Sequence, residues 1–233
     1  MAKIPKILIF TLDYLPSFGG VATYLFGIAR ELPVGNIAVL SDSSLIKEKS
    51  KPDVKHPIFY ETLISKKRFP KWSPAFGALS RTLKKFDADV ILCPNILPLG
   101  LVSYFVAQSL GKKYMISLHG LDLLLAQSSK RKSRIAKFVL KRAHLVIVNS
   151  NYTKKLVQDF VKLENVPVVA YPCPLAEPKV YERNEARKYL DINYDQTVIL
   201  SVGRLVRRKG FEKIISIMPF LLKKEHDLRY IIV

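Results

Sequence analysis

A cationic segment near the end of the chain has residue types and spacing that suit anion binding. The run TVILSVGRLVRRKG is followed by the amphipathic stretch FEKIISIMPFLLKK. A buried strand over Val198–Val202 that ends at Gly203 would leave Arg204 and Lys209 at the carboxyl end of a parallel strand, where ligands of open α/β sheets bind. The start of the next helix adds positive potential there. Two cations beside a helix start predict a diphosphate site.

Two other strand ends carry residues that suit a ligand. Gly19 and Gly20 precede a helix, and paired glycines let backbone N–H groups approach an anion, although a tight turn explains such a pair equally well. His119 ends another strand, where it can donate a hydrogen bond to a sugar hydroxyl or transfer a proton. A histidine that only caps a strand end is an equally good interpretation.

Three further polar residues follow strand ends, each with a structural alternative. Asp122 suits a helix N-cap or a contact to an acceptor, and Ser150 suits an N-cap better than a ligand contact. Asn95 stands before a turn, where asparagine is common. Carboxyl ends of parallel strands share an edge, so we expect one ligand-binding edge. Its expected members are Gly19, Gly20, Asn95, His119, Ser150 and Arg204.

Short Val/Ile/Leu runs alternate with helical patterns along the chain. The expected strands are Ile4–Phe10, Ile37–Ser41, Ile58–Leu63, Ala88–Cys93, Tyr114–Leu118, Leu145–Asn149, Val166–Tyr171, Val198–Val202 and Leu228–Val233. The expected helices are Val21–Leu32, Pro74–Phe86, Leu99–Leu110, Lys130–Ala143, Tyr152–Val161, Arg183–Leu190 and Phe211–Lys224. Continuously apolar strands separated by helices predict a doubly wound, Rossmann-like parallel α/β sheet.

The alternation breaks once, between Pro172 and Arg183, where prolines outside any periodic pattern mark a linker. We therefore predict a complete α/β domain over residues 1–172 and the first β-α-β of a second domain over 173–233. A piece of that size is too small to bury a sufficient core alone. Contact with the first domain, or self-association with a second copy, is the expected source of its stability.

Composition indicates a folded, strongly basic protein. Hydrophobic residues make up 49% of the chain and the formal net charge is +19, so disorder is disfavoured. The stretches Lys66–Lys85 and Lys130–Arg142 contain no acidic residue. Such surfaces attract the phosphates of nucleic acid, anionic lipid or substrate, or are simply solvated helix faces. Nucleic acid is disfavoured, because the sequence contains no nucleic-acid-binding module or aromatic stacking pattern.

The cysteines and apolar segments bear on the compartment. Cys93 and Cys173 lack CxxC spacing, which favours a reducing compartment over a disulfide or zinc site. The N-terminal apolar stretch is too short for a signal peptide. The uncharged segment Val90–Gly111 is long enough to span a membrane, but Pro94 and Pro98 interrupt it, so strand, loop and helix fit it better.

Four segments now carry a family resemblance: FGGVATYLFGIAREL, SLHGLDLL, VIVNSNYTKKLV and SVGRLVRRKGFEKII. Their order and approximate spacing resemble those of the GT-B fold retaining glycosyltransferases of family 4, in particular the phosphatidylinositol mannosyltransferase branch and related hexosyltransferases. The resemblance covers the whole chain, and its most specific piece is the GR…KG segment. It implies two Rossmann-like domains facing each other across a cleft, the first mainly for the acceptor and the second mainly for a nucleotide-sugar donor.

The resemblance also implies roles for single residues. Arg204 and Lys209 would bind the donor diphosphate and stabilise charge on the leaving group. The N–H groups at Gly19 and Gly20 would approach the same phosphates or the acceptor, and His119 would contact the donor sugar near the reacting carbon. The acceptor-side residues would be Asn95, Asp122 and Ser150.

The implied reaction moves a hexose to a lipid-linked or glycan acceptor, with retention and without a metal or other cofactor. GDP-mannose and UDP-sugars are both open as donors. The family's E-x₇-E glutamates are expected beyond position 233. The chain is therefore expected to be the N-terminal part of a longer enzyme, binding donor weakly and turning over little. A non-catalytic lipid- or glycan-binding domain and a GT-B-fold sugar-nucleotide epimerase remain alternatives.

Family members that act on lipid acceptors dock on membranes through a basic, amphipathic part of the first domain. In Lys66–Lys85 aromatic residues stand beside cations, a composition suited to anionic headgroups. The expected contacts are Lys66, Lys67, Arg68, Lys71 and Trp72. The helix over Lys130–Ala143 is instead expected to pack on the sheet with a solvated outer face. The expected location is cytoplasmic, peripheral on the inner face of the cytoplasmic membrane.

Overall fold

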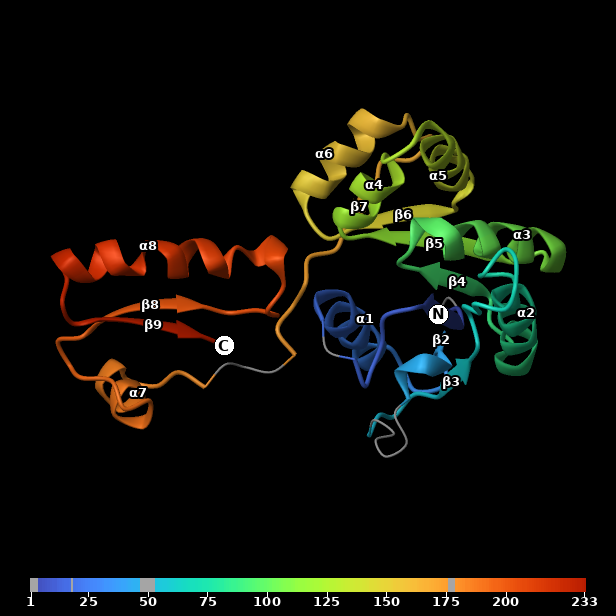
Figure 1. Ribbon diagram of the computed structural model, residues 1–233. Helices are drawn as coiled ribbons and strands as arrows, with labels where there is room; N and C mark the ends of the chain where they lie inside the picture. Colours follow the sequence, from blue (N-terminus) through green and yellow to red (C-terminus); the bar gives the residue numbers. More distant parts are fainter. Residues whose placement is uncertain (1–3, 18, 47–52, 176–178) are drawn as a thin grey trace. The chain divides into compact units, whose positions relative to one another are not determined.

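The computed structural model describes residues 4–17, 19–46, 53–175 and 179–233, which form two compact units, Met1–Ala176 and Glu177–Val233 (Figure 1). The first unit contains a seven-stranded sheet in the order β3-β2-β1-β4-β5-β6-β7, in which every neighbouring pair is parallel. This confirms the predicted Rossmann-like sheet. Its strands are β1 (Ile7–Thr11), β2 (Ile37–Asp42), β3 (Ile58–Glu61), β4 (Val90–Cys93), β5 (Lys113–Leu118), β6 (Leu145–Val148) and β7 (Val168–Val169).

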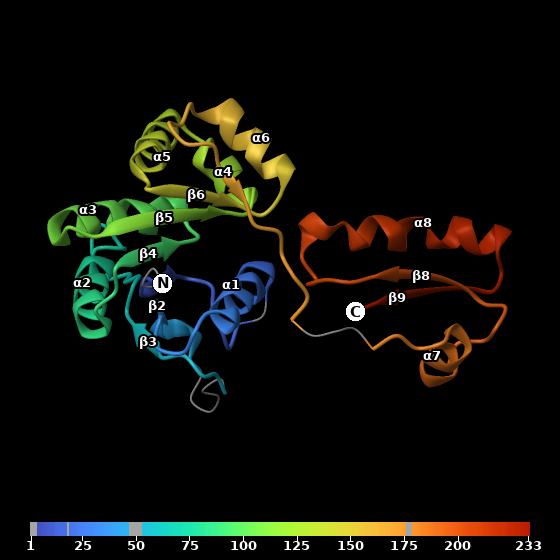
Figure 2. The ribbon, with the colours of Figure 1, turned by 180° about the vertical axis from the view of Figure 1, so that it is seen from behind.

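Helices cover both faces of this sheet (Figure 2). Side chains of a strand alternate between its faces, so neighbouring residues enter different cores. Ile9 of β1 packs with Leu25 of α1, whereas Leu8 and Phe10 pack in the larger core on the other face, with α2, α3 and α5. The helices of the unit are α1 (Gly20–Glu31), α2 (Pro74–Phe86), α3 (Leu101–Leu110), α4 (Leu121–Ala126), α5 (Lys130–Arg142) and α6 (Asn151–Phe160).

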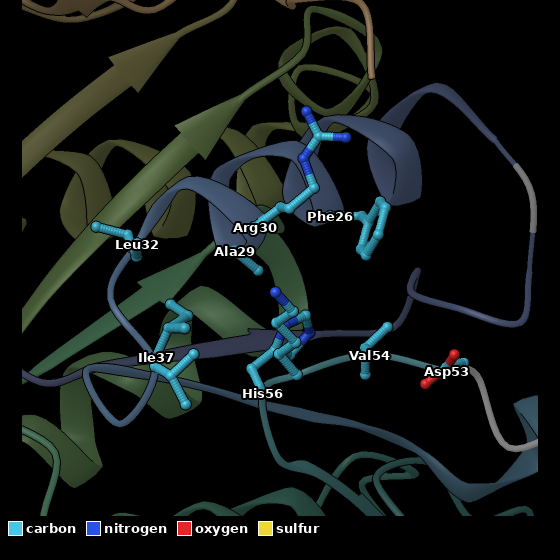
Figure 3. A pocket seen from close by; sticks show the side chains of 10 residues that line it. Phe26, Ala29, Arg30, Leu32, Ile37, Asp53, Val54 and His56 are labelled. Carbon is cyan, nitrogen blue, oxygen red and sulfur yellow. The ribbon is translucent and has the colours of Figure 1, made fainter. Parts of the chain in front are cut away.

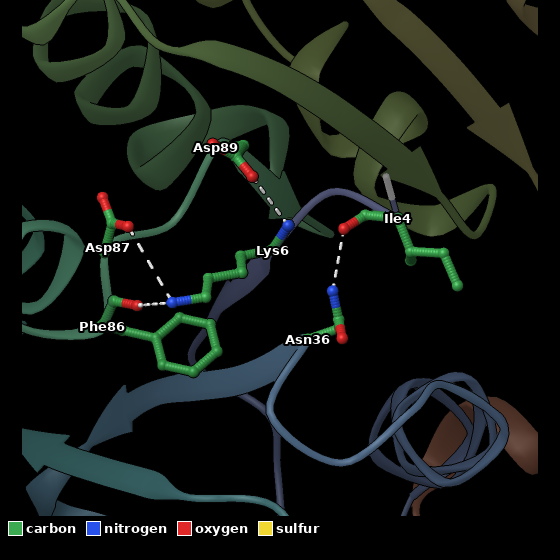
Figure 4. Close-up of polar contacts among 6 residues, drawn as sticks. All are labelled: Ile4, Lys6, Asn36, Phe86, Asp87 and Asp89. Atoms are coloured by element: carbon green, nitrogen blue, oxygen red, sulfur yellow. Dashed lines mark hydrogen bonds and ion pairs between the residues drawn. The ribbon is translucent and has the colours of Figure 1, made fainter. Parts of the chain in front are cut away.

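Polar contacts fix the amino edge of the sheet, where β1 begins (Figure 4). The main-chain N–H of Lys6 donates to Asp89 Oδ2 at 2.9 Å, and its Nζ lies 3.5 Å from the carbonyl oxygen of Phe86 and 3.8 Å from Asp87 Oδ2. The amide of Asn36 donates to the carbonyl oxygen of Ile4 at 2.8 Å. These contacts hold the loops before β2 and β4 to the start of β1, at the end opposite to the predicted ligand edge.

The second unit is a β-α-β element preceded by a short helix. Strands β8 (Thr197–Ser201) and β9 (Leu228–Ile232) pair in parallel, with α8 (Phe211–Lys224) between them in the chain and α7 (Arg183–Tyr189) before them. Among the described residues of this unit only Phe211 is buried, while Phe220 and Leu200 are more than half exposed. The element has the predicted topology but little core of its own.

Observed and predicted elements differ mainly at three places. The strand expected from Ile4 begins at Ile7. The edge strand β7 is also shorter than expected and covers Val168–Val169; it begins after Pro167, which lacks the N–H that a strand residue donates. Helix α4 was not predicted. Val90–Gly111 forms β4, a helical turn over Ile96–Gly100 and α3, as expected. Within the described ranges, no helix combines the length and apolarity needed to cross a bilayer.

Gly100 provides a test of this packing. A Cβ added there would lie 2.9 Å from the Asn95 carbonyl oxygen and 3.1 Å from a Val139 methyl carbon, so Gly100→Ala is expected to destabilise the protein by about 1–3 kcal/mol. Denaturant unfolding measures this change. Gly20→Ala is the matched control, because no atom from another part of the described chain lies within 4 Å of its added Cβ. Equal midpoints for the two variants would contradict the packing around Gly100.

Candidate functional site

Three of the predicted site residues follow adjacent strands of the first unit. Asn95 comes after β4, His119 directly after β5, and Ser150 after β6, and these strands are neighbours in the sheet. Neighbouring strands lie about 4.8 Å apart, so the three residues are close together along the carboxyl edge. Gly20 begins α1, which follows β1, the other neighbour of β4, and Gly19 precedes it with extended backbone (φ 177°). The five expected site residues of the first unit therefore all follow carboxyl ends of strands, at one edge of the sheet.

A tight turn joins His119 to Asp122. The backbone of Gly120 has a φ of 95°, a conformation that favours glycine, and α4 begins at the next residue. This turn directs Asp122 back toward the strand end, where its Oδ1 accepts a hydrogen bond from the His119 main-chain N–H at 3.2 Å. Asp122 is thus in the first turn of α4 and is not its N-cap, because Gly120 occupies that position.

Several buried polar atoms at this edge have no hydrogen-bond partner among the described residues. They are Asn95 Oδ1, His119 Nε2 and Asp122 Oδ2, together with the hydroxyls of Ser117 on β5 and Ser41 on β2. Buried polar atoms in folded proteins are almost always hydrogen-bonded. The atoms of Asn95, His119 and Asp122 follow the ends of the neighbouring strands β4 and β5, whereas Ser41 and Ser117 are buried within their strands.

Burial shifts the titration of His119 and Asp122 in opposite directions. It lowers the pKa of His119 to about 4, and it raises the pKa of Asp122 to about 6 against hydrogen bonds that act to lower it. His119 is therefore neutral at pH 7, while Asp122 is ionised close to its titration point. A neutral imidazole can donate to or accept from a hydroxyl, and the nearby carboxylate can only accept.

Tyr24 of α1 packs against His119 and was not predicted as part of the site. The two rings meet edge to face with centroids 5.0 Å apart, and the Tyr24 hydroxyl donates to the carbonyl oxygen of Ala170 at 3.1 Å. These contacts hold the imidazole from the α1 side. The only signal in the sequence was the position of Tyr24 one helical turn after Gly20.

Ser150 has a structural role in this arrangement. Its Oγ accepts from the Thr153 main-chain N–H at 3.1 Å and so caps α6. Its hydroxyl also lies 3.4 Å from Asn149 Oδ1, to which the Thr153 hydroxyl donates at 2.8 Å. Ser150 is thus the N-cap of α6, and its hydroxyl is less available to a ligand than the His119 ring.

Arg204 and Lys209 belong to the second unit. Both are exposed, Arg204 after β8 and Lys209 at the end of a short 3-10 turn over Arg207–Lys209. The Lys209 side chain lies along Gly203, where an added Cβ would be 3.8 Å from Nζ, so its ammonium group lies at the carboxyl end of β8. Among the described residues, β8 pairs with β9 alone, in a sheet separate from that of the first unit. The expectation that Arg204 shares one sheet edge with Gly19, Asn95 and His119 is therefore wrong.

The loop between β3 and α2 carries the predicted membrane contacts. Its cations Lys66, Lys67, Arg68 and Lys71 are exposed. Phe69 in their midst is 99% exposed, whereas Trp72 is half-buried and packs on Phe76 with ring centroids 5.7 Å apart. Trp72 thus anchors the loop to the core, and Phe69 is the aromatic side chain that the loop presents to solvent.

A pocket of about 260 Å³ lies apart from these residues, between α1 and the segment before β3 (Figure 3). Phe26 and Arg30 line it from α1, and His56 lines it from the other side. The buried His56 ring bonds through Nε2 to the Tyr14 hydroxyl at 2.7 Å, and burial lowers its pKa. None of the predicted site residues lines this pocket. In the part of the chain that the structure describes, no group of three His, Cys, Asp or Glu side chains is placed to hold a metal ion.

Comparisons with known proteins agree with this architecture. The model of Glycosyltransferase Family 4 matches residues 18–175. No curated protein sequence matches the chain. Among solved structures, HepE of Anabaena in complex with UDP and glucose is similar over 98% of this chain and 60% of its own, with a TM-score of 0.71 and 19% identity. This chain thus spans less than two thirds of HepE.

Two further structures extend the comparison. Sucrose-phosphate synthase from Thermosynechococcus elongatus is similar over 97% of this chain and 70% of its own, with a TM-score of 0.69 and 16% identity. UDP-N-acetylglucosamine 2-epimerase from Rickettsia bellii is similar over 99% and 62%, with a TM-score of 0.53 and 9% identity. At such identities the likeness shows the fold alone, and it confirms the predicted GT-B type of Rossmann-like architecture.

The opposite pKa shifts of His119 and Asp122 are expected to cancel in the pH dependence of stability, so that replacing either residue alone reveals the effect of the other. A carboxyl pKa that folding raises, as in Asp122, contributes stability below pH 4, and this contribution is lost as the pH rises to 6. A histidine pKa that folding lowers, as in His119, contributes stability that is lost as the pH falls from 6.5 to 4. As the pH rises from 4 to 6, the free energy of unfolding of His119→Gln is therefore expected to fall relative to that of the wild type, by on the order of 2 kcal/mol. That of Asp122→Asn is expected to rise by a similar amount.

Denaturant unfolding at several pH values measures both slopes. The double variant His119→Gln/Asp122→Asn serves as the control, since its difference from wild type is expected to stay constant across this range. Slopes of the same sign in the two single variants would contradict the burial of one of the two groups.

Proposed function

The chain belongs to glycosyltransferase family 4, and on this basis we propose that it is part of a hexosyltransferase that uses a nucleotide-diphosphate sugar. The acceptor is lipid-linked or a glycan, and transfer proceeds with retention. One observation carries the proposal: Asn95, His119 and Asp122 bring buried, unpartnered polar atoms to the carboxyl edge of the sheet. Such atoms suit the hydroxyl groups of a sugar, which both donate and accept hydrogen bonds.

Cations of the second unit bind the donor diphosphate in this proposal. Arg204 and Lys209 are exposed, and the Lys209 ammonium group lies beside Gly203 at a strand end. When the bond between sugar and diphosphate breaks, negative charge accumulates on the leaving diphosphate, and fixed cations stabilise it without a metal ion. The N–H groups at Gly19 and Gly20 contribute further donors to the phosphates or to the acceptor.

His119 contacts the donor sugar, while Asn95 and Asp122 are assigned to the acceptor side. The low pKa of His119 supports this role, because a neutral imidazole can bond to a sugar hydroxyl without first losing a proton. The pKa of Asp122, about 6, lies near the range in which a carboxylate can take up a proton from an acceptor hydroxyl. Ser150 acts here by holding the start of α6.

A UDP-sugar is the favoured donor, with GDP-mannose and the mannosyltransferase branch as the alternative. HepE, whose fold this chain shares, has been crystallised with UDP-glucose. A sugar-nucleotide epimerase is a second candidate, because the Rickettsia bellii epimerase has a similar fold. Product analysis separates the two: an epimerase returns a nucleotide sugar, whereas a transferase releases a nucleoside diphosphate.

The loop between β3 and α2 docks the protein on an anionic membrane from the cytoplasmic side in this proposal. Its four exposed cations surround the fully exposed ring of Phe69. Cations gain about 1 kcal/mol each near an anionic surface, and an aromatic ring settles at the headgroup level. A lipid-linked acceptor would be reached from this position.

Donor binding is tested by calorimetric titration of the chain with UDP and GDP. We expect weak binding that falls at least tenfold in Arg204→Ala/Lys209→Ala, because each side chain loses a charge-assisted contact to phosphate. Arg208→Ala is the matched control, since Arg208 is exposed in the same turn but has no assigned contact. Binding that survives in the double variant would contradict the diphosphate assignment.

Membrane docking is tested by pelleting with vesicles of phosphatidylglycerol and phosphatidylcholine. Phe69→Ser combined with Lys66→Glu and Lys67→Glu is expected to reduce the bound fraction more than tenfold, through lost ring insertion and reversed charge. The control Lys84→Glu/Lys85→Glu changes exposed cations at the other end of α2 and is expected to weaken binding less. Equal losses would show a diffuse charge effect and would overturn the loop assignment.

A further inference from the structure

The short helix α4 exposes three leucines on one face. Leu121, Leu124 and Leu125 are 50%, 53% and 58% exposed, whereas Leu123 of the same helix is fully buried. Residues spaced by three and four positions lie together on a helix surface, so the three side chains form one patch. Single exposed leucines are ordinary on protein surfaces, but a contiguous apolar patch marks an interaction site.

This patch adjoins the candidate site. Asp122, which bonds to the His119 main chain, lies on the same helix between Leu121 and Leu123. Its Oδ2 is buried without a partner in the described part of the chain, so one side of α4 turns a polar atom toward the site while another presents leucines to solvent. A molecule with both polar and apolar parts can contact the two sides at once.

Exposed cations follow the patch in the chain, at the start of α5. Helix α5 begins four residues after α4 ends, and Ser129 caps it by accepting from the Lys132 main-chain N–H at 3.3 Å. Its first turns carry Lys130, Arg131, Lys132 and Arg134, all exposed. The sequence has no acidic residue between Asp122 and Asp159, and none of the ion pairs found among the described residues involves α5.

Helix α5 packs on the sheet, as expected, and its buried residues are Ala136, Val139 and Leu140. The exposed cations lie outside this packed face. A purely solvated face would explain the cations, but it does not explain the exposed leucines of α4. An apolar patch flanked by positive charge complements a molecule with a hydrocarbon chain and a negatively charged group.

We propose that the surface formed by Leu121, Leu124, Leu125 and the first cations of α5 binds an anionic amphiphile, which makes the acceptor an anionic lipid rather than a soluble glycan. The hydrocarbon chain covers the leucines, and the anionic group lies against the Lys130–Arg134 segment. Identifying the amphiphile as the acceptor rests on the proposed glycosyl transfer. Binding of the amphiphile is independent of that function, because binding requires neither donor nor turnover.

Titration of the chain with decyl phosphate below its micelle concentration tests the proposal. Covering two half-exposed leucines contributes enough that Leu124→Ser/Leu125→Ser is expected to weaken binding about tenfold. Lys130→Ser/Arg131→Ser is expected to weaken it severalfold through lost charge. Both substitutions change exposed side chains, so the variants are expected to fold, and their thermal unfolding verifies this.

Matched controls separate this surface from general attraction to a basic protein. Phe105→Ser removes an aromatic ring of α3 that is 49% exposed, and Lys141→Ser removes a cation from the other end of α5; neither is expected to change binding. Phe69→Ser is also expected to have no effect, because a monomeric amphiphile offers no membrane for the β3–α2 loop.

Two comparison ligands complete the design. Inorganic phosphate is expected not to bind measurably, and decyl maltoside to bind more weakly than decyl phosphate. Equal binding of decyl maltoside would overturn the requirement for an anionic group. Unchanged affinity in Leu124→Ser/Leu125→Ser would overturn the assignment to α4, whatever the outcome of the nucleotide titrations.

Discussion

Parallel pairing is the constraint on which the rest of the structure depends. Since all strands of the first unit run in one direction, every loop that leaves a carboxyl end emerges on the same edge. Residues as distant in sequence as Gly20 and Ser150 are gathered there by this rule, without direct contact between them. The amino edge is closed by structural contacts such as that between Lys6 and Asp89 (Figure 4). Contacts at the amino edge thus stabilise the fold, and the candidate site lies at the carboxyl edge.

The site edge departs from the usual rules of folded proteins in a consistent way. His119 and Asp122 are half-buried, and each has one buried side-chain atom, Nε2 and Oδ2 respectively, without a partner among the described residues. Each is unfavourable for stability alone, and a ligand that supplies the partners would stabilise the folded chain by binding it. Helix α4 links these features, because it buries Leu123 in the core, turns Asp122 to the strand end and exposes the leucine patch beside the cations of α5.

Sequence patterns predicted elements with clear local signals. Helix α2 has the predicted bounds because Pro74 suits a first turn and Asp87 ends it in a left-handed conformation. Helix α4 was missed, since LDLLLA is too short to show a period. Strand-end reasoning correctly placed His119 at the end of β5. It gives no information on which sheet a strand joins, so it placed Arg204 on the wrong edge. The composition of the β3–α2 loop did not distinguish the half-buried Trp72 from the exposed Phe69, because loop side chains follow no period.

The central claim is that the carboxyl edge around His119 binds a nucleotide sugar. Side-chain ¹⁵N–¹H correlation spectra of the chain, titrated with millimolar UDP-glucose at neutral pH, test it most directly. The sequence contains four histidines, so His56, His144 and His226 act as internal references. The account predicts that the His119 signals are those of a neutral ring and that they shift on titration while those of His56 stay fixed. An unshifted His119, or a shift of His56 in its place, would contradict the account.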